Sequence, residues 1–219
     1  MQMKITSKAL IIGNGDIGIL IHKKIDFKKY DYCLILDSAI NNYYTYEQNQ
    51  HPDALLGDFD GNFDPLIWKK IYPNLEIIHT PDQEKTDFEK GIEFLIQKKI
   101  THITGIGLTG KRMDHTFNNI SSLAKYNTEI DIQLIDDYSK IYCIDHNKPF
   151  IKFLSQNTIL SLLPIGKVIG ITTKNLDYNL NNENLELGVR TGSSNAVSTN
   201  NYVEITITQG KLIIMECND

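Results

Sequence analysis

The sequence predicts an α/β N-terminal domain with a mostly parallel sheet over residues 1–138, followed by an all-β, sandwich-like domain over residues 139–219. Two observations support this division. Before about residue 136, short apolar runs alternate with segments of helical spacing, as in parallel sheets covered on both faces. After about residue 140, short and often alternating runs are separated by turn-prone segments, as in antiparallel sheets. With 219 residues, the chain has room for both cores.

The first domain is expected to contain six apolar strands. They cover residues 9–13, 32–37, 54–58, 75–79, 102–107 and 132–136. Helices are expected where apolar residues recur every three or four positions. Residues 88–96 have this spacing, and residues 117–124 nearly do, with Phe117 on the expected packing face.

The stretch "TPDQEKTDFEK" (residues 80–90) contains two signals for a helix start. Thr80 with Gln83 and Thr86 with Glu89 both have the Thr-x-x-Gln/Glu spacing of a capping box. Because one helix needs one cap, we expect the helix to begin at Thr86 and residues 80–85 to form a loop at a strand end. Asp87 then lies in the first turn of the helix.

The second domain is expected to consist of short strands without a long helix. The runs cover residues 140–145, 149–154, 158–165, 167–173, 185–190, 202–210 and 211–216. By composition alone, the polar segments 172–180 and 191–198 are ordinary hairpin turns.

Composition restricts the class of protein. A net charge of -5 argues against a nucleic-acid-binding surface. The N-terminus has no signal-peptide pattern, and no apolar run is long enough to span a membrane. We therefore expect a cytoplasmic protein with no nucleic-acid or membrane partner. Cys33 and Cys143 lie inside apolar runs and are expected to be buried free thiols.

Acidic and small polar residues follow the expected parallel strands at the point where each strand ends. Examples are Asp37 after the second strand and Asp58 after the third. In an open parallel sheet, ligands bind beyond the carboxyl ends of the strands. This clustering predicts a functional site at that edge.

The segment "GDFDG" places Asp58 and Asp60 two residues apart. If the backbone stays extended there, both carboxylates point to the same side and suit a hard divalent cation such as Mg²⁺. The alternative is a loop in which each acid caps a turn. Asp37 and Asp87 at neighbouring strand ends favour metal binding.

The segment "GLTGKRMDH" supplies positive charge. Gly107 and Gly110 allow close approach of a ligand, and the planar guanidinium of Arg112 suits phosphate oxygens. Asp114 has the alternative of capping a helix that begins at His115. Lys111 has the alternative of a solvated side chain.

The segment "GNGDIG" (Gly13, Gly15, Gly18) fits the dinucleotide-binding pattern, with Asp37 about twenty residues further on. This supports an alternative function, that of a nicotinamide-dependent oxidoreductase. A non-catalytic nucleotide-binding protein is a third possibility.

The sequence resembles the thiamine pyrophosphokinase (thiamin diphosphokinase) family from about Asp37 to Asn195. The matching stretches, in the family's order, are "LDSAIN", "PDALLGDFDG", "TPDQEKTDFEKG", "GIGLTGKRMDHTFNNISSL", "SLLPIGKVIGITTKNLDYNL" and "GSSNAVS". The resemblance implies a homodimer in which the α/β domain binds ATP and Mg²⁺ and a β domain of the partner subunit completes a thiamine pocket. It implies transfer of a pyrophosphoryl group from ATP to the thiamine hydroxyl, with release of AMP.

The resemblance also implies roles for particular residues. The Mg²⁺ ligands would be Asp58, Asp60 and Asp87, which with Arg112 and Asp114 would form the catalytic set. ATP would be bound by Asp37, Gln83, Lys85, Thr86, Arg112, Asp114, His115 and Asn118. Thiamine would be bound by Tyr178, Ser194 and Asn195. The proton of the thiamine hydroxyl would pass to Asp58, Asp87 or Asp114.

The sequence departs from the family pattern at several turns. Ser38-Ala39 replaces a usual Gly-Gly pair, "TGKR" replaces the more usual Gly-Gly-Arg, and Asn175 stands where Gly is common. Gly adopts positive φ freely, Asn tolerates it, and Ser or Ala resist it. Tyr178 stands where the family often has Trp, which leaves a smaller ring face.

Overall fold

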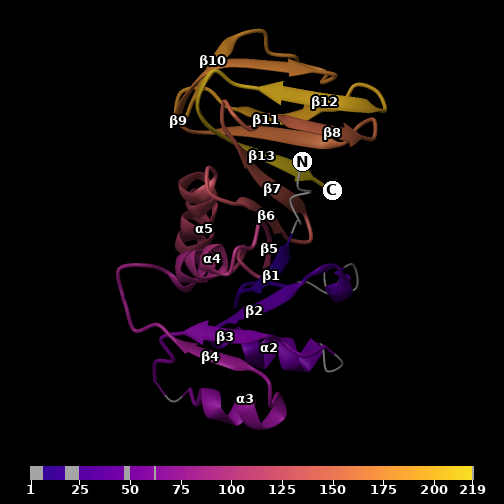
Figure 1. The fold of residues 1–219 in the computed structure, drawn as a ribbon. Coiled ribbons are helices and arrows are strands. Elements are labelled where there is room, and N and C mark those ends of the chain that lie inside the picture. The colour runs from indigo at the N-terminus through magenta and orange to yellow at the C-terminus, as the bar shows by residue number, and fades with distance from the viewer. Residues whose placement is uncertain (1–6, 18–24, 47–49, 62, 219) are drawn as a thin grey trace, which may run out of the picture. The chain divides into compact units, whose positions relative to one another are not determined.

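The computed structural model describes residues 7–17, 25–46, 50–61 and 63–218 (Figure 1). The chain divides into two compact units. The first comprises Met1–Asn119 and Glu129–Asp137, and the second comprises Ile120–Thr128 and Tyr138–Asp219. The division passes through the long helix α5.

The first unit contains the six expected strands. They are β1 (Lys8–Ile12), β2 (Tyr32–Leu36), β3 (Ala54–Gly57), β4 (Glu76–His79), β5 (His102–Ile106) and β6 (Asp131–Ile135). The helices are the 3-10 helix η1 (Phe27–Lys29), α2 (Ala39–Tyr46), α3 (Pro65–Ile71), α4 (Asp87–Gln97) and α5 (Met113–Tyr126). All pairs are parallel, in the order β4-β3-β2-β1-β5-β6. The predicted parallel sheet is confirmed.

Helices cover both faces of this sheet because alternate strand residues point to opposite sides. Leu10 and Ile35 join a buried cluster with Ile40 of α2. Leu34, on the other face, lies against α4, where a Cβ added to Gly91 would be 3.2 Å from its side chain. Each buried Leu or Ile stabilises the fold by about 1.5–3 kcal/mol.

Helix α4 begins where the sequence predicts. Thr86 is its N-cap, and the Thr86 Oγ1 accepts a hydrogen bond from the Glu89 N–H at 3.3 Å. The Glu89 Oε2 accepts one from the Thr86 N–H at 3.2 Å, which completes the capping box. The second of the two cap signals is therefore the one that starts the helix.

Apolar spacing did not indicate α2 and α3. For α3 the local signals are clear, since Asp64 is its N-cap and Pro65 follows at the first position. The apolar side chains of α3, however, do not form a buried stripe. Leu66 is 62% exposed and Ile67 is 52% exposed.

Helix α5 differs from the sequence interpretation at two positions. It begins at Met113, so Asp114 lies in its first turn, which excludes the alternative that Asp114 caps a helix beginning at His115. Phe117 is 64% exposed and does not belong to the packing face. Thr116 and Asn119 are buried instead, and their side chains bond the carbonyls of Gly110 and Leu108 at 3.2 and 2.8 Å.

The second unit is an antiparallel β structure, as predicted. Its strands are β7 (Ser139–Ile144), β8 (Phe150–Leu154), β9 (Ile159–Lys174), β10 (Glu183–Glu186), β11 (Gly192–Ala196), β12 (Asn201–Thr206) and β13 (Gln209–Cys217). One buried cluster, which includes Leu162, Val168, Ile205 and Leu212, joins their inner faces in a sandwich-like core.

Two details of this unit differ from expectation. The runs 158–165 and 167–173 form one strand, β9, because Gly166 adopts a φ of 71° inside the strand. The segment 191–198, read as a hairpin turn, contains strand β11, which pairs with β9 through a register shift. A bulge or glycine in mid-strand bends a strand without ending it.

The free thiols and the surface fit the composition. Cys143 is buried, and burial raises the pKa of its thiol to about 12, so it stays protonated. Cys33 is only half-buried.

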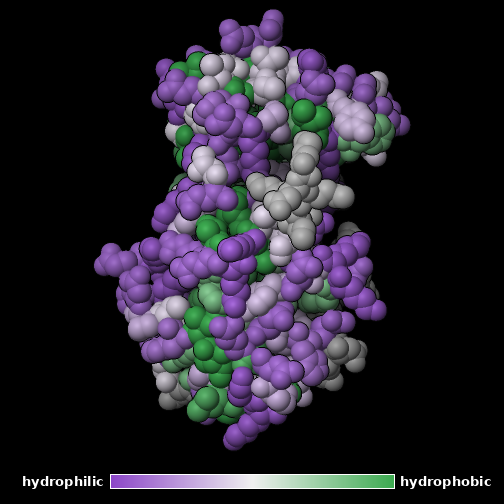
Figure 2. Space-filling view, viewed as in Figure 1, coloured by the Kyte–Doolittle hydropathy of each residue, from purple (hydrophilic) through white to green (hydrophobic). Residues whose placement is uncertain are grey.

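The face seen in Figure 2 is mainly hydrophilic. No helix in the described part of the chain is both long and apolar enough to cross a membrane.

Candidate active site

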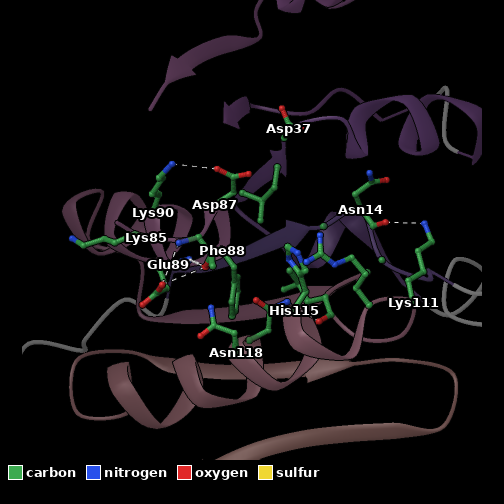
Figure 3. Close-up of a pocket in the computed structure, with 18 of the residues that line it drawn as sticks. Asn14, Asp37, Lys85, Asp87, Phe88, Glu89, Lys90, Lys111, His115 and Asn118 are labelled. Atoms are coloured by element: carbon green, nitrogen blue, oxygen red, sulfur yellow. Dashed lines mark hydrogen bonds and ion pairs between the residues drawn. The ribbon is translucent and has the colours of Figure 1, made fainter. Parts of the chain in front are cut away.

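A cleft of about 730 Å³ lies in the first unit, where the loops after β1, β2, β3, β4 and β5 meet (Figure 3). It is lined by Gly13–Gly15, Leu36–Ser38, Asp58, Gln83–Lys90, Gly107–Arg112, His115, Asn118 and Asn119. The expected meeting of polar strand ends is therefore present.

The cleft brings together nine of the residues singled out in the sequence. They are Asp37, Asp58, Gln83, Lys85, Thr86, Asp87, Arg112, His115 and Asn118. Asp60 and Asp114 belong to the same unit but do not line the cleft. The proposed thiamine residues Tyr178, Ser194 and Asn195 lie in the second unit.

Asp37 sits directly after β2 in a tight turn. Its φ is 46°, and its N–H donates to the Leu56 carbonyl at 2.8 Å. Gly57 is needed beside it, because a Cβ at Gly57 would lie 3.0 Å from the Asp37 Cβ. The Asp37 Oδ1 is buried and has no hydrogen-bond partner within the described residues.

Asp87, the first residue of α4, lies near two other acids, Asp37 and Asp58. Burial raises the pKa of Asp87, and the negative charges of Asp58 and Asp37 raise it further. The ammonium of Lys90 opposes this shift. Asp37 and Asp58 therefore lie close enough to Asp87 for their charges to act on it, and the three residues are called the acid cluster below.

Lys90, which was not singled out in the sequence, supports this cluster. The residue is only 8% exposed, and its Nζ lies 2.8 Å from the Thr80 carbonyl and 3.5 Å from the Asp87 Oδ1 (Figure 3). It thereby joins the end of β4 to the first turn of α4. Its position three residues after Asp87 was the signal in the sequence.

The backbone at Asp58–Asp60 is not extended, contrary to the stated premise. Phe59 adopts a φ of 54°, and the Asp60 N–H donates to the Asp58 Oδ1 at 3.4 Å, as in a turn capped by Asp. Asp60 is exposed. Asp58 points into the cleft, where the Gln83 Nε2 donates to its Oδ2 at 3.0 Å and lowers the pKa of Asp58.

Arg112 and Asp114 form an exposed pair at the start of α5. The Arg112 Nε donates to the Asp114 Oδ1 at 3.1 Å, and its Nη2 donates to the other carboxylate oxygen. This pairing lowers the pKa of Asp114. Asp114 therefore orients the guanidinium at the edge of the cleft.

The glycines of "GNGDIG" are explained by packing. A Cβ at Gly13 or Gly15 would lie 2.5 Å from the Gly107 carbonyl oxygen. The N–H groups of Gly13 and Gly15 donate to the carbonyls of Ile106 and Gly107 at 2.9 and 2.6 Å. Because these N–H groups are already bonded, they do not form the pyrophosphate cradle of a dinucleotide site. Gly18 lies outside the described residues.

Asn14 follows β1, at one of the strand ends where the sequence predicted polar residues, but its contacts were not predicted. Its Nδ2 donates to the Ser38 Oγ, and its Oδ1 accepts from the Asn42 Nδ2, both at 2.9 Å. Its carbonyl accepts from the Lys111 Nζ at 2.8 Å. Asn14 thus connects the loops after β1, β2 and β5. These contacts could not be predicted from the local sequence, because every partner of Asn14 is distant in the chain.

The candidate thiamine residues are adjacent in the second unit. Asn195 is buried, and its side chain brackets the main chain of Tyr178: the Oδ1 accepts from the Tyr178 N–H at 3.1 Å, and the Nδ2 donates to its carbonyl at 2.7 Å. The Tyr178 side chain is 76% exposed. Ser194 and Asn175 adopt φ values of 58° and 65°, the latter as expected for Asn replacing Gly.

The acids of the cleft do not form a metal site by themselves. Within the described residues, no group of three or more His, Cys, Asp or Glu side chains could hold a metal ion. Mg²⁺ does not need one, since it takes one or two carboxylates and fills its shell with water and phosphate oxygens. The unpartnered Asp37 Oδ1 and the crowded charges at Asp87 are consistent with this.

Comparison with known proteins gave consistent matches over both units. A family model described as "Thiamin pyrophosphokinase, catalytic domain" matches residues 25–134, and one described as "Thiamin pyrophosphokinase, vitamin B1 binding domain" matches residues 146–212. Thiamin pyrophosphokinase 1 of Caenorhabditis elegans is 25% identical over 185 residues, covering 79% of this chain and 74% of that protein. Thiamine pyrophosphokinase of Bacillus subtilis is 27% identical over 172 residues, covering 77% and 79%.

Solved structures show the same fold. The thiamine pyrophosphokinase structure from Bacillus subtilis has a TM-score of 0.83 at 22% identity and covers 97% of this chain and 100% of its own. The thiamin pyrophosphokinase from Candida albicans has a TM-score of 0.85 at 18% identity, with 98% and 90% covered. At these identities the structures support the fold alone.

Proposed function

The chain belongs to the thiamin pyrophosphokinase family, whose enzymes transfer pyrophosphate from ATP to thiamine, and we propose that the cleft of the first unit is where it binds ATP for this reaction. The products are AMP and thiamine diphosphate. The observation that supports the proposal most is the cleft itself. Apart from Gly13–Gly15, its lining lies in the segment matched by the catalytic-domain model, and it brings the acid cluster together with Lys111 and Arg112.

Asp58, Asp60 and Asp87 are the proposed holders of Mg²⁺. The positions of Asp58 and Asp87 in the cleft support their assignment, and Asp37 stands beside them. The assignment of Asp60 rests on sequence alone, since its side chain is exposed and does not line the cleft. A bound Mg²⁺ would neutralise charge on the phosphate oxygens.

The protein's own contribution is positioning and charge, which carry most of the rate in phosphoryl-type transfer. Gln83 orients Asp58, and Lys90 orients Asp87. Arg112, held by Asp114, stabilises negative charge on the transferred group. Asp58, Asp87 or Asp114 accepts the proton of the thiamine hydroxyl.

The remaining nucleotide residues line the same cleft. Asp37, Lys85, Thr86, His115 and Asn118 are proposed to bind ATP. Their assignment is supported by their place in the cleft wall, on loops and helices that follow three different strands, β2, β4 and β5.

Tyr178, Ser194 and Asn195 are proposed to bind thiamine. Tyr178 offers an exposed ring face to a cationic ring, an arrangement that favours cation–π contact. The proposed functional domains are residues 1–138 and 139–219. A homodimer and a cytoplasmic location remain predictions.

The two other functions lack support. The loop that suggested a nicotinamide cofactor has its glycine N–H groups bonded within the protein, and both family models describe a thiamin pyrophosphokinase. A non-catalytic nucleotide-binding protein is not favoured either, because the family models and the named relatives are those of an enzyme.

One assay separates the three functions. The protein is incubated with ATP, Mg²⁺ and thiamine, and AMP and thiamine diphosphate are measured by chromatography. Both products should appear in equal amounts, and neither without thiamine or with excess EDTA. ATP binding without AMP release, or tight NAD(H) binding without a need for Mg²⁺, would contradict the proposal.

A further inference from the structure

Lys111 occupies an unusual backbone position in the wall of the cleft. Its φ is 50°, in the left-handed region that side chains with a Cβ adopt at a cost. Glycine avoids this cost. Residues held in such conformations cluster at functional sites. In contrast to Lys99, which also has a positive φ, Lys111 has its strained backbone in the wall of the cleft, where its side chain can reach a ligand.

The charge of Lys111 is also distinctive. The other Lys and Arg side chains that line the cleft each contact a carboxylate: Lys85 with Glu93 at 2.8 Å, Lys90 with Asp87 at 3.5 Å, and Arg112 with Asp114. The Lys111 Nζ donates to the neutral carbonyl of Asn14 at 2.8 Å, and it has no carboxylate partner in the part of the chain that the structure describes. Its positive charge is thus available to a ligand.

The surroundings hold this ammonium at a defined place. Asn14, its acceptor, is itself fixed by Ser38 and Asn42. Figure 3 shows Lys111 reaching to Asn14 on the other side of the cleft from Asp87 and Lys90. A phosphate chain whose Mg²⁺ lies beside the acid cluster would meet the Lys111 ammonium on the opposite side of the cleft.

We propose that Lys111 binds the phosphate chain of ATP beside Arg112 and so determines ATP affinity in this chain. The inference rests on the proposed function, which names ATP as the substrate. Lys111 is the departure from the usual Gly-Gly-Arg pattern noted in the sequence. The ammonium leaves the Asn14 carbonyl, or shares its protons with it, when phosphate oxygens are present.

The test uses Lys111→Met, which removes the charge, and Lys111→Gly, which removes the charge and the backbone strain. ATP affinity is measured by calorimetry with Mg²⁺, and KM is measured for ATP and for thiamine. Both variants should bind ATP about tenfold more weakly, as expected for a lost charge-assisted hydrogen bond. The thiamine KM should stay within about twofold. The loss of ATP affinity should shrink at high salt.

Lys99 provides a matched control. It too is an exposed lysine with positive φ, at 62°, but it lies after α4 and away from the cleft. Lys99→Met and Lys99→Gly should leave ATP affinity and both KM values unchanged. Lys111→Gly should melt no lower than the unmodified protein, because glycine relieves the strained φ.

Three results would overturn the inference: unchanged ATP affinity in Lys111→Met, an equal rise of both KM values, or a loss of ATP affinity in the Lys99 variants as large as in the Lys111 variants. Weaker ATP binding in Lys111→Met by a protein that forms no thiamine diphosphate would refute the proposed activity but support the phosphate site. The two proposals can therefore fail separately.

Discussion

The proposed role of Asp60 as a Mg²⁺ ligand can be tested directly by substitution. It follows the cleft acid Asp58 by two residues but is exposed, with Phe59 turned between them. Asp60→Asn should lower kcat by about a hundredfold without loss of fold, because a ligand carboxylate positions phosphate charge. Asp26→Asn, an exposed acid on η1, should leave kcat unchanged. Near-normal turnover of Asp60→Asn at saturating Mg²⁺ would remove Asp60 from the site.

Tyr178 is held by its main chain while its ring is exposed. Tyr178→Ala should raise the thiamine KM by about tenfold and leave the ATP KM nearly unchanged, because only the ring face is lost. Tyr202→Ala removes another exposed tyrosine of the same unit, 57% exposed, and serves as the control. If both KM values rise equally, Tyr178 is structural and does not contact thiamine.

At this scale, the sequence identified the acids of the cleft and missed their supports. Two of these acids, Asp37 and Asp58, directly follow strands, and Asp87 begins a helix. Such positions can be recognised in the sequence from the neighbouring apolar run or helix cap. Asn14 and Lys90 act through partners at Ser38 and Thr80, which only the folded chain brings near. Tertiary hydrogen bonds leave no periodic signal, so these contacts required the structure, although the spacing of Lys90 three residues after Asp87 is visible in the sequence.

Helix α4 joins stability to function through its first turn. Thr86 caps the helix and also lines the cleft. Thr86→Ala should cost about 1 kcal/mol and lower Tm by roughly 2–4 °C. It should also lower kcat by at least about tenfold, because the first turn carries Asp87.

The control is the cap of another helix. Asp64 caps α3 through the Leu66 N–H at 2.9 Å and does not line the cleft. Asp64→Ala should destabilise the protein by a similar amount and leave kcat unchanged. Thermal melts and steady-state rates of the two variants decide the point. Equal rates would show that the Thr86 cap has no functional part.

Elements were predictable where one local pattern dominates. The capping box and apolar stripe of α4 located that helix, while α3 exposes its apolar residues and gives no stripe. In α5, Thr116 and Asn119 are buried because each bonds a loop carbonyl, which reverses the side that hydropathy indicates. Polar burial of this kind depends on a neighbouring loop and is absent from the helix's own sequence.

The free energy of unfolding of the protein should depend on the protonation of the acids in the cleft. Folding raises the pKa of Asp87 above its ordinary value of 3.8, mainly by burial. The folded protein therefore binds this proton more tightly than the unfolded chain. The stabilising contribution is full below the unfolded pKa and is lost as pH rises through the folded pKa. At neutral pH without metal, Asp87→Asn should raise Tm. With Mg²⁺ present, the same variant should have a lower kcat.

Asp58 gives the opposite sign. Its pKa is lowered, first by the Gln83 hydrogen bond, so its contribution is present above the unfolded pKa and is lost as pH falls through the folded pKa. Asp58→Asn should therefore lower Tm slightly at neutral pH. Scanning calorimetry in EDTA compares the two variants. A lower Tm for Asp87→Asn than for Asp58→Asn would contradict the assignment.

The fold class of each unit was predictable from the point where alternating strands and helices give way to closely spaced strands. Alternating strands and helices required a parallel sheet, and closely spaced strands required an antiparallel one. No pattern in the sequence indicated that α5 contributes residues to both units. A helix shared in this way has one continuous pattern and no linker to mark a boundary.

The bracket that Asn195 forms around the main chain of Tyr178 has a consequence for how such a protein diversifies. The loop shape depends on the amide at position 195, and the ring at position 178 takes no part in it. A gene duplicate can therefore exchange the side chain at 178 freely while keeping its scaffold. Changing Asn195, in contrast, alters the loop for every possible occupant. The side chain exposed by this loop and the shape of the loop thus depend on two different residues.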